Sequence, residues 1–208
     1  MIHRIKRLIK SFFEKKVAYG FKSPSARISP TAKIYTPENL FMYEHTNIDG
    51  GAIIMNTRAK FIMKKYSGAA VGLLVVTGNH LLLPVYWVKD INDKIKTKYD
   101  TNHLYDKDVI VEDDVWLASN VTLLSGVTIG RGAIIGAGSV CRTNIPPYAI
   151  AMGNPAKVVG FKFSLPDIIE HEKKLYPEEE RLPIDLLEKN YKKYFTGRIP
   201  EIKQYLKI

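Results

Sequence analysis

The chain has 208 residues, only one of them cysteine, and a formal net charge of +10. No apolar stretch approaches the roughly 20 residues needed to cross a bilayer, and charges interrupt every apolar run at the N-terminus, so we expect neither a transmembrane helix nor a secretory signal. The charge favours an anionic partner, but no nucleic-acid-binding motif accompanies it, and a cytoplasmic protein that does not bind nucleic acid is expected.

Residues 1–27 are expected to form an N-terminal amphipathic helix, over residues 1–19, and a short lead-in. Apolar residues recur there at helical spacing, and basic residues cover the rest of the surface. The apolar positions are Ile2, Ile5, Leu8, Ile9, Phe12 and Phe13. Such a helix either caps the open end of a repeat domain or lies on an anionic membrane surface, as a peripheral contact on the inner face. The sequence leaves both interpretations open.

From Ile28 onward an apolar residue tends to return every sixth position. The positions that follow this period, with a register slip near Asn47, are Ile28, Ile34, Leu40, Gly51, Thr57, Met63, Ala69 and Val75. Residues 81–108 then interrupt the period, which resumes in the same phase. A long segment between two stretches in one phase is expected to be an excursion loop from a corner, and loops of this length are usually functional.

Between Val111 and Cys141 the period of six is strict. One series is Val111, Leu117, Leu123, Ile129, Ile135 and Cys141, and a second is Val115, Val121, Val127, Ala133, Ser139 and Ile145. A helix repeats at 3.6 residues and a strand at two, so a period of six indicates short rungs joined by regular corners, as in a parallel β-helix. Cys141 falls on a core position, which favours a buried small residue over a catalytic thiol.

The Pro146-Pro147 pair ends the repeat. Residues 153–163 are expected to be extended and to lead away from the last coil. Residues 164–208 are expected to form a helical C-terminal extension, because Pro166 and Pro183 suit the first turns of helices. The domains predicted are therefore residues 1–27, a β-helix over residues 28–163 that includes the 81–108 excursion, and residues 164–208.

Among the five histidines, His80 is the candidate for catalysis. It follows Thr77-Gly78-Asn79 at a corner, where the excursion begins, and an imidazole exposed there can take a proton from a hydroxyl. Gly78 suits the tight backbone of a corner. No two histidines are close in sequence, so no metal site is expected.

The strict hexads, Thr77-Gly78-Asn79-His80, Asp114-Val115-Trp116 and Gly153-Asn154-Pro155-Ala156-Lys157 together resemble the hexapeptide-repeat acyltransferases. The similarity covers roughly residues 28–163 and is greatest to sugar and polysaccharide O-acetyltransferases, including galactoside and maltose acetyltransferases. The resemblance implies a left-handed parallel β-helix, acetyl-CoA as acyl donor, no metal, and a homotrimer with sites between subunits. It also implies direct transfer of the acetyl group to a hydroxyl of a sugar or surface-polysaccharide precursor.

The resemblance assigns roles to individual residues. His80 matches the catalytic base, Trp116 an aromatic near the pantetheine arm, and Ser119 and Ala137 small positions along that arm. The cations and hydroxyl expected near the nucleotide end are Arg142, Thr143 and Lys157, although relatives often have threonine-lysine where this chain has Arg142-Thr143. The polar candidates for acceptor binding are Asp49, Asn56, Arg58 and Asn79.

Three other functions remain open at this stage. One is N-acetylation of an amino sugar, although such enzymes usually carry an additional N-terminal domain, for which the residues before Ile28 are too few. Another is a non-catalytic β-helix scaffold, which would need neither the His80 corner nor the cations. A zinc-dependent carbonic anhydrase on the same fold is disfavoured by the histidine spacing.

Overall fold

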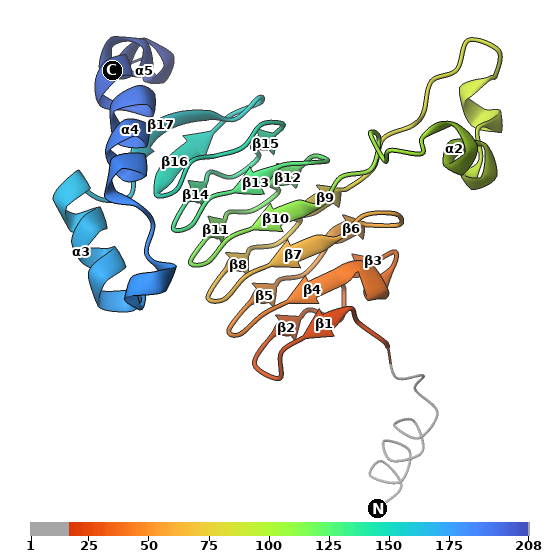
Figure 1. The fold of residues 1–208 in the computed structure, drawn as a ribbon, viewed down its shortest axis with the longest axis horizontal. Coiled ribbons are helices and arrows are strands. Elements are labelled where there is room, and N and C mark those ends of the chain that lie inside the picture. The colour runs from red at the N-terminus through yellow and green to blue at the C-terminus, as the bar shows by residue number, and fades with distance from the viewer. Residues whose placement is uncertain (1–16, 208) are drawn as a thin grey trace, which may run out of the picture.

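The computed structural model describes residues 17–207, so the helix expected over residues 1–19 falls almost wholly outside the described range. The chain winds into a solenoid with three sheets as its walls, whose strands are all parallel except the last strand of one sheet (Figure 1). In residues 17–207 no helix is long and apolar enough to cross a membrane.

The three walls are here called sheets I, II and III, in the order in which the first coil meets them. Sheet I consists of β1 (Phe21–Lys22), β4 (Leu40–Met42), β7 (Phe61–Met63), β10 (Val109–Val111) and β13 (Thr128–Ile129). Sheet II consists of β2 (Arg27–Ile28), β5 (Asn47–Ile48), β8 (Gly68–Ala69), β11 (Trp116–Leu117), β14 (Ile134–Ile135), β16 (Ala149–Met152) and β17 (Lys157–Phe161). Sheet III consists of β3 (Lys33–Ile34), β6 (Ile53–Met55), β9 (Leu74–Val76), β12 (Thr122–Leu123) and β15 (Val140–Cys141). The corners are named I–II, II–III and III–I after the sheets that they join.

The strict repeat forms the core as expected. Each of its coils places one apolar residue of every strand inward, directly above its counterpart in the coil below, and the six positions from Val111 to Cys141 are all buried. The second series is buried too, beside the corners. Directly before five of these second-series residues stands a residue with positive φ: Asp114, Asn120, Gly126, Gly132 and Gly138. Glycine, asparagine and aspartate tolerate this backbone best, so the sequence turns each corner at little cost.

In the upstream coils the predicted register is wrong at Gly51 and Thr57. The strand pairing places Ile48 and Ile54 inward instead, in the columns of Ala69 and Val75. Relative to a strict six-residue repeat, the sequence contains two insertions, whereas a single register slip was expected. The 3-10 turn Pro37–Asn39 adds residues between Ile34 and Met42, and residues 56–60 add more before Met63. Gly51 is instead a corner residue with a φ of 70°.

The ends of the solenoid differ from its middle. The first strand, β1, lies at Phe21–Lys22, so the first coil begins before Ile28. At the other end β17 turns back antiparallel to β16 and leads to three helices, α3 (Leu165–Leu175), α4 (Ile184–Tyr194) and α5 (Ile199–Leu206). The excursion leaves after β9 and carries a 3-10 turn, Val88–Asp90, and helix α2 (Asp93–Tyr99), which project to one side (Figure 1).

Helices α3 and α4 are fastened to the solenoid at corner I–II by a buried polar cluster. The Glu172 carboxylate accepts hydrogen bonds from Arg131 Nη1 at 2.8 Å, from Tyr148 Oη at 2.6 Å and from the backbone N–H of Leu182 at 2.9 Å. Arg131 also lies 3.6 Å from Asp113. Every strong charge inside this corner therefore faces an opposite charge or a donor.

Candidate functional site

His80 lies at corner III–I, just beyond the end of β9, and its side chain is exposed. It borders a cavity of about 210 Å³ between the solenoid and the excursion. The cavity is lined on the solenoid side by Met55 and Arg58 and on the excursion side by Ile91 and Lys96. An imidazole in this position can meet a small molecule that enters from solvent.

The backbone around His80 is held by the two ends of the excursion, which pair with each other. The N–H of Asn79 donates to the carbonyl of Tyr105 at 2.7 Å, and the N–H of Lys107 donates to the carbonyl of Thr77 at 2.9 Å. A Cβ at Gly78 would overlap the carboxylate of Asp106. The φ of Gly78 is not positive, so glycine is needed there for room rather than for backbone freedom.

Asp106 occupies that room, and its side chain is only 2% exposed. Its carboxylate accepts a hydrogen bond from Arg58 Nε at 2.9 Å and one from Lys96 Nζ at 2.6 Å. Lys96 Nζ also donates to the carbonyl oxygen of Asn79 at 2.7 Å, and Arg58 Nη1 donates to Thr97 at 3.1 Å. Two cations from different segments thus neutralise one buried carboxylate beside the cavity.

The structure separates the four residues predicted for acceptor binding. Arg58 and Asn79 line the cavity with His80. Asn56 does not, and this prediction is corrected: its side chain is buried, accepts from the N–H of Thr36 at 3.1 Å and donates to the Thr36 carbonyl at 2.8 Å, so it holds a turn. Asp49 is exposed on another edge, where sheet II meets corner II–III.

The residues predicted for acetyl-CoA binding lie along sheets II and III and their corners. Trp116 stands on the outer face of sheet II, 47% exposed, where Gly68 of the neighbouring strand leaves room for its ring. Ser119 and Ala137 lie at corner II–III, where the N–H of Gly138 donates to the carbonyl of Ser119 at 2.9 Å. These small side chains leave an open edge along the solenoid.

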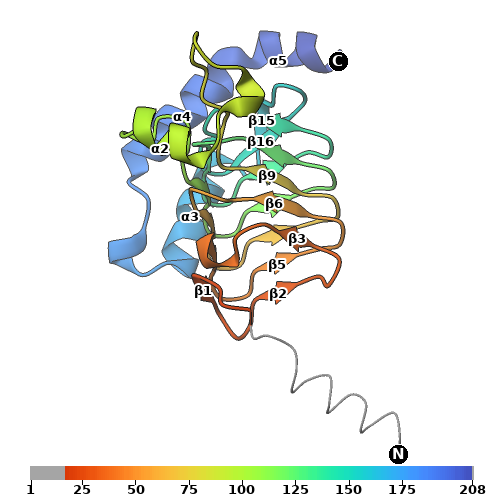
Figure 2. The ribbon, with the colours of Figure 1, turned by 90° about the vertical axis from the view of Figure 1, so that its right-hand side faces the viewer.

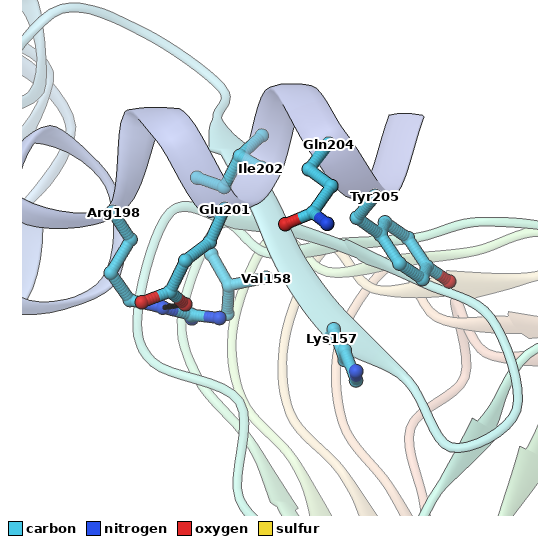
Figure 3. A pocket seen from close by; sticks show the side chains of 7 residues that line it. All are labelled: Lys157, Val158, Arg198, Glu201, Ile202, Gln204 and Tyr205. Carbon is cyan, nitrogen blue, oxygen red and sulfur yellow. Dashed lines mark hydrogen bonds and ion pairs between the residues drawn. The ribbon is translucent and has the colours of Figure 1, made fainter. Parts of the chain in front are cut away.

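The predicted cations are exposed near the C-terminal end. Arg142 and Thr143 follow β15 at corner III–I. Lys157 begins β17, and its Nζ lies 5.4 Å from the ring centre of Tyr205. Lys157 and residues of α5 line a cavity of about 270 Å³ (Figure 3).

Within one chain the predicted site residues are spread around the solenoid: Trp116 and Lys157 lie on sheet II, and Arg142 and Thr143 share a corner with His80. His80 lies at corner III–I, whereas Ser119 and Ala137 lie at corner II–III, with the width of sheet III between them. In the described part of the chain no helix crosses the outer face of sheet III (Figure 2), where Ile53 and Met55 are about 40% exposed. One chain alone does not bring the two groups together.

Cys141 is buried in the core, and burial raises the pKa of its thiol to about 12. A thiol with this pKa stays protonated at neutral pH and is a poor nucleophile, as its place in the hexads predicts. Among residues 17–207 no group of three or more His, Cys, Asp or Glu side chains could hold a metal ion.

Sequence reasoning did not single out Lys96 or Asp106. Both lie in the excursion, which has no period, and Lys96 is one of several lysines in a short basic run. The polar cluster at corner I–II was missed as well, because Arg131 and Glu172 are 41 residues apart and only the packing of α3 joins them.

Residues 108–143 match the family model described as bacterial transferase hexapeptide (six repeats). No curated protein sequence matches the chain. A hexapeptide-repeat acetyltransferase from Vibrio cholerae, solved with acetyl coenzyme A, is 21% identical, with 69% of this chain and 71% of that chain covered at a TM-score of 0.57. A maltose O-acetyltransferase from Clostridium difficile 630 is 22% identical, with 76% and 84% covered at a TM-score of 0.54.

AntD, an N-acyltransferase from Bacillus cereus solved with dTDP and 3-hydroxybutyryl-CoA, has the same fold. It is 17% identical, with 81% of this chain and 93% of that chain covered at a TM-score of 0.54. Likeness at these identities concerns the fold. Residues 108–143 are therefore bacterial transferase hexapeptide repeats, and the chain has the left-handed parallel β-helix fold of the hexapeptide-repeat acetyltransferases.

Proposed function

We propose that the protein is an acetyl-CoA-dependent O-acetyltransferase that acts on a hydroxyl of a sugar or surface-polysaccharide precursor, with His80 as general base. The observation that carries the proposal is the position of His80. It is an exposed imidazole that borders a cavity lined by both polar and apolar side chains, in a chain whose fold is that of acetyltransferases. A general base must lie where the acceptor can reach it, and this corner satisfies that condition.

Acetyl-CoA, when bound, supplies an acetyl group activated as a thioester. The His80 imidazole takes the proton from the acceptor hydroxyl as its oxygen attacks the acetyl carbonyl, and later returns a proton to the departing thiolate. Arg58 and Asn79 line the same cavity and would hold polar groups of the acceptor.

The residues present at the predicted donor site fit such a donor. The pantetheine arm is narrow, and Ser119 and Ala137 keep corner II–III free of large side chains. Trp116 offers an exposed ring on the adjoining sheet. Arg142 and Lys157 are exposed cations that can meet phosphates.

A homotrimer would join the two corners, with His80 of one chain facing corner II–III of the next. Light scattering in solution would test the mass, and a mixing experiment would test the shared site. His80→Ala and Ser119→Trp variants, each inactive alone, should regain part of the activity when unfolded and refolded together. No recovery from a mixed oligomer would show that each site lies within one chain.

The central test measures free coenzyme A released from acetyl-CoA with maltose, isopropyl galactoside or glucosamine as acceptor. His80→Ala should lower the rate by about 10²- to 10⁴-fold, the usual contribution of a general base. His45→Ala is the matched control, because His45 is also exposed in a coil but stacks on Tyr66, with ring centres 4.9 Å apart. A His80→Ala variant as fast as the wild type would remove the catalytic assignment.

The same assay weighs the alternatives. The shared fold of AntD makes N-acylation the second candidate, and turnover with the amine of glucosamine but not with maltose would favour it. Failure to bind acetyl-CoA at all, measured by calorimetry, would favour a non-catalytic scaffold. Peripheral membrane contact through residues 1–19 remains a prediction, and equal flotation on anionic liposomes with and without these residues would reject it.

A further inference from the structure

We propose that Asp106 is a positioning residue for His80, and that it acts through Lys96. This inference rests on the proposed function, because it assigns a role to residues that would serve the same proton transfer. It adds a task for helix α2 (Asp93–Tyr99), which carries Lys96 and otherwise projects away from the solenoid.

The contacts form a continuous path from the carboxylate to the backbone of His80. Asp106 Oδ1 accepts from Lys96 Nζ at 2.6 Å, and the same ammonium donates to the carbonyl oxygen of Asn79 at 2.7 Å. That carbonyl belongs to the peptide bond that joins Asn79 to His80. Because a peptide unit is planar, holding its oxygen also orients the N–H of His80 and limits where its side chain points.

The corner is held from its other side as well. The carbonyl of Thr77 accepts from Ser125 Oγ at 2.8 Å and from the N–H of Lys107 at 2.9 Å. Thr77 Oγ1 in turn donates to the carbonyl of Ala59 at 3.2 Å. The three residues before His80 are therefore fixed at both ends, and the Asp106 cluster supplies the end nearer the imidazole.

Burial gives these contacts strength. The side chains of Asp106, Lys96 and Arg58 are 2%, 12% and 18% exposed, so water screens their attraction far less than it would at the surface. The His80 ring itself makes no hydrogen bond to any of residues 17–207. The hydrogen bonds that place His80 therefore act on the backbone before it, where the Asp106 cluster lies.

The test begins with amide hydrogen exchange of the folded protein, measured by mass spectrometry. Asp106→Asn should speed exchange in residues 77–81 and 105–107 and leave the coils from Val111 to Cys141 unchanged. Asp113→Asn is the matched control, because Asp113 is a buried carboxylate beside Arg131 at corner I–II. Unchanged exchange at residues 77–81 in Asp106→Asn would overturn the proposal, whatever the activity.

The kinetic arm uses coenzyme A release with maltose and glucosamine as probes. Asp106→Asn and Lys96→Met should lower kcat by about 10- to 100-fold, as a misplaced catalytic group does, with the KM for acetyl-CoA unchanged. Lys96→Arg should recover most of kcat, because a guanidinium can bond both the carboxylate and the Asn79 carbonyl. A loss that appears in KM alone, or that Lys96→Arg does not relieve, would overturn the proposal.

A double-mutant cycle separates positioning from general stabilisation. In the His80→Ala background, Asp106→Asn should cause no further loss, because no imidazole remains to be placed. A similar fold-loss in both backgrounds would show that Asp106 only stabilises the corner. If wild type and His80→Ala are equally slow with every probe, the proposed function fails, and this inference fails with it. If the wild type is active and Asp106→Asn keeps the full kcat, the inference alone is rejected.

Discussion

Corners I–II and III–I of the solenoid each contain a buried ion cluster, but the two clusters have different neighbours. Each encloses a buried carboxylate that accepts hydrogen bonds from a cation on another segment: Glu172 from Arg131, and Asp106 from Lys96 and Arg58. At corner I–II the cluster joins α3 to the solenoid, and Glu172, 2% exposed, lines a cavity between α3 and α4 that contains no histidine. At corner III–I the cluster borders an open cavity and is one peptide unit away from an exposed histidine.

The comparison shows that a buried ion cluster does not by itself mark a functional site. The neighbours of the cluster decide what it does. The cluster of Glu172 fastens helices to a wall, so its loss should cost stability and spare activity. The cluster of Asp106 fixes a backbone that carries an exposed base, so its loss should cost activity as well as stability.

The largest expected effect on stability is at Glu172. Glu172→Gln leaves the charge of Arg131 buried without its main partner, and Arg131 Nε already lacks a hydrogen bond within residues 17–207. The free energy of unfolding should fall by about 3 to 5 kcal/mol, measured by urea denaturation. Glu170→Gln on the same helix breaks only the exposed pair with Lys174, and should leave the urea midpoint where it was.

If Glu172→Gln lowered coenzyme A release as strongly as His80→Ala, at a temperature where it is fully folded, the contrast between the corners would be wrong.

Tyr148 offers a milder change at the same corner. Its hydroxyl is buried and donates to Glu172 at 2.6 Å, and Tyr148→Phe removes that bond, together with the 3.0 Å contact to His171 Nδ1, without changing the ring. A hydrogen bond to a charged group is worth about 1.5 to 3 kcal/mol, so the unfolding free energy should fall by that amount. Tyr43→Phe, at an exposed ring, is the control and should change it by less than about 0.5 kcal/mol. Equal losses in both would mean that the buried bond contributes nothing.

Gly78 tests corner III–I through packing alone. Gly78→Ala pushes a methyl group against the Asp106 carboxylate and should cost about 1 to 3 kcal/mol of unfolding free energy, together with a loss of kcat. Gly160→Ala is its control, because a Cβ there meets nothing within 4 Å and its φ is not positive. A Gly78→Ala variant with wild-type kcat would show that activity tolerates displacement of the Asp106 carboxylate.

The smallest expected effect is a pH dependence at His171. Burial is the main cause that lowers the pKa of His171, with Lys162 and Arg131 acting in the same direction and Asp114 and Glu172 opposing them. The unfolded chain therefore binds the proton more readily, so stability is lost as the pH falls below the ordinary histidine pKa of about 6.5.

His171→Gln should lessen that loss, so the difference in urea midpoint between variant and wild type should change with pH below about pH 6.5 and stay level above it. The ring also contacts Tyr148 Oη, at 3.0 Å from Nδ1, and Asp114, at 3.8 Å from Nε2. A difference that is constant from pH 5 to 8 would assign the effect to these contacts instead of to titration.

The fold could be predicted where every coil repeats the same environment. Val111, Leu117 and Leu123 each point into the core from a strand with the same surroundings, so the same kind of residue returns at each sixth position. The register failed at Gly51 and Thr57, because a corner can take extra residues without disturbing the strands on either side. Such insertions change the spacing of core residues without changing which types of residue occupy the core, so the sequence alone does not locate them.

The candidate site was predictable only in part. His80 was singled out because it stands where the period stops; the structure places it exposed beside a cavity, and its catalytic role stays a prediction. Asn56 was misassigned, because a polar residue at a corner can bond its own turn, as it does with Thr36. Lys96 and Asp106 meet only through the fold of an aperiodic excursion, so no spacing in the sequence could pair them.

The antiparallel direction of β17 affects whether further coils could stack on this end of the solenoid. A stack of identical parallel coils presents the same edge at its end as in its middle, and another chain could continue it without limit. Here the last strand of sheet II runs against its neighbour, and the N–H groups of Val140 and Ala156 are already used across the final turn. A coil arriving in the parallel direction would meet a mismatched hydrogen-bonding pattern on sheet II, so this end is a poor template for a coil of another chain.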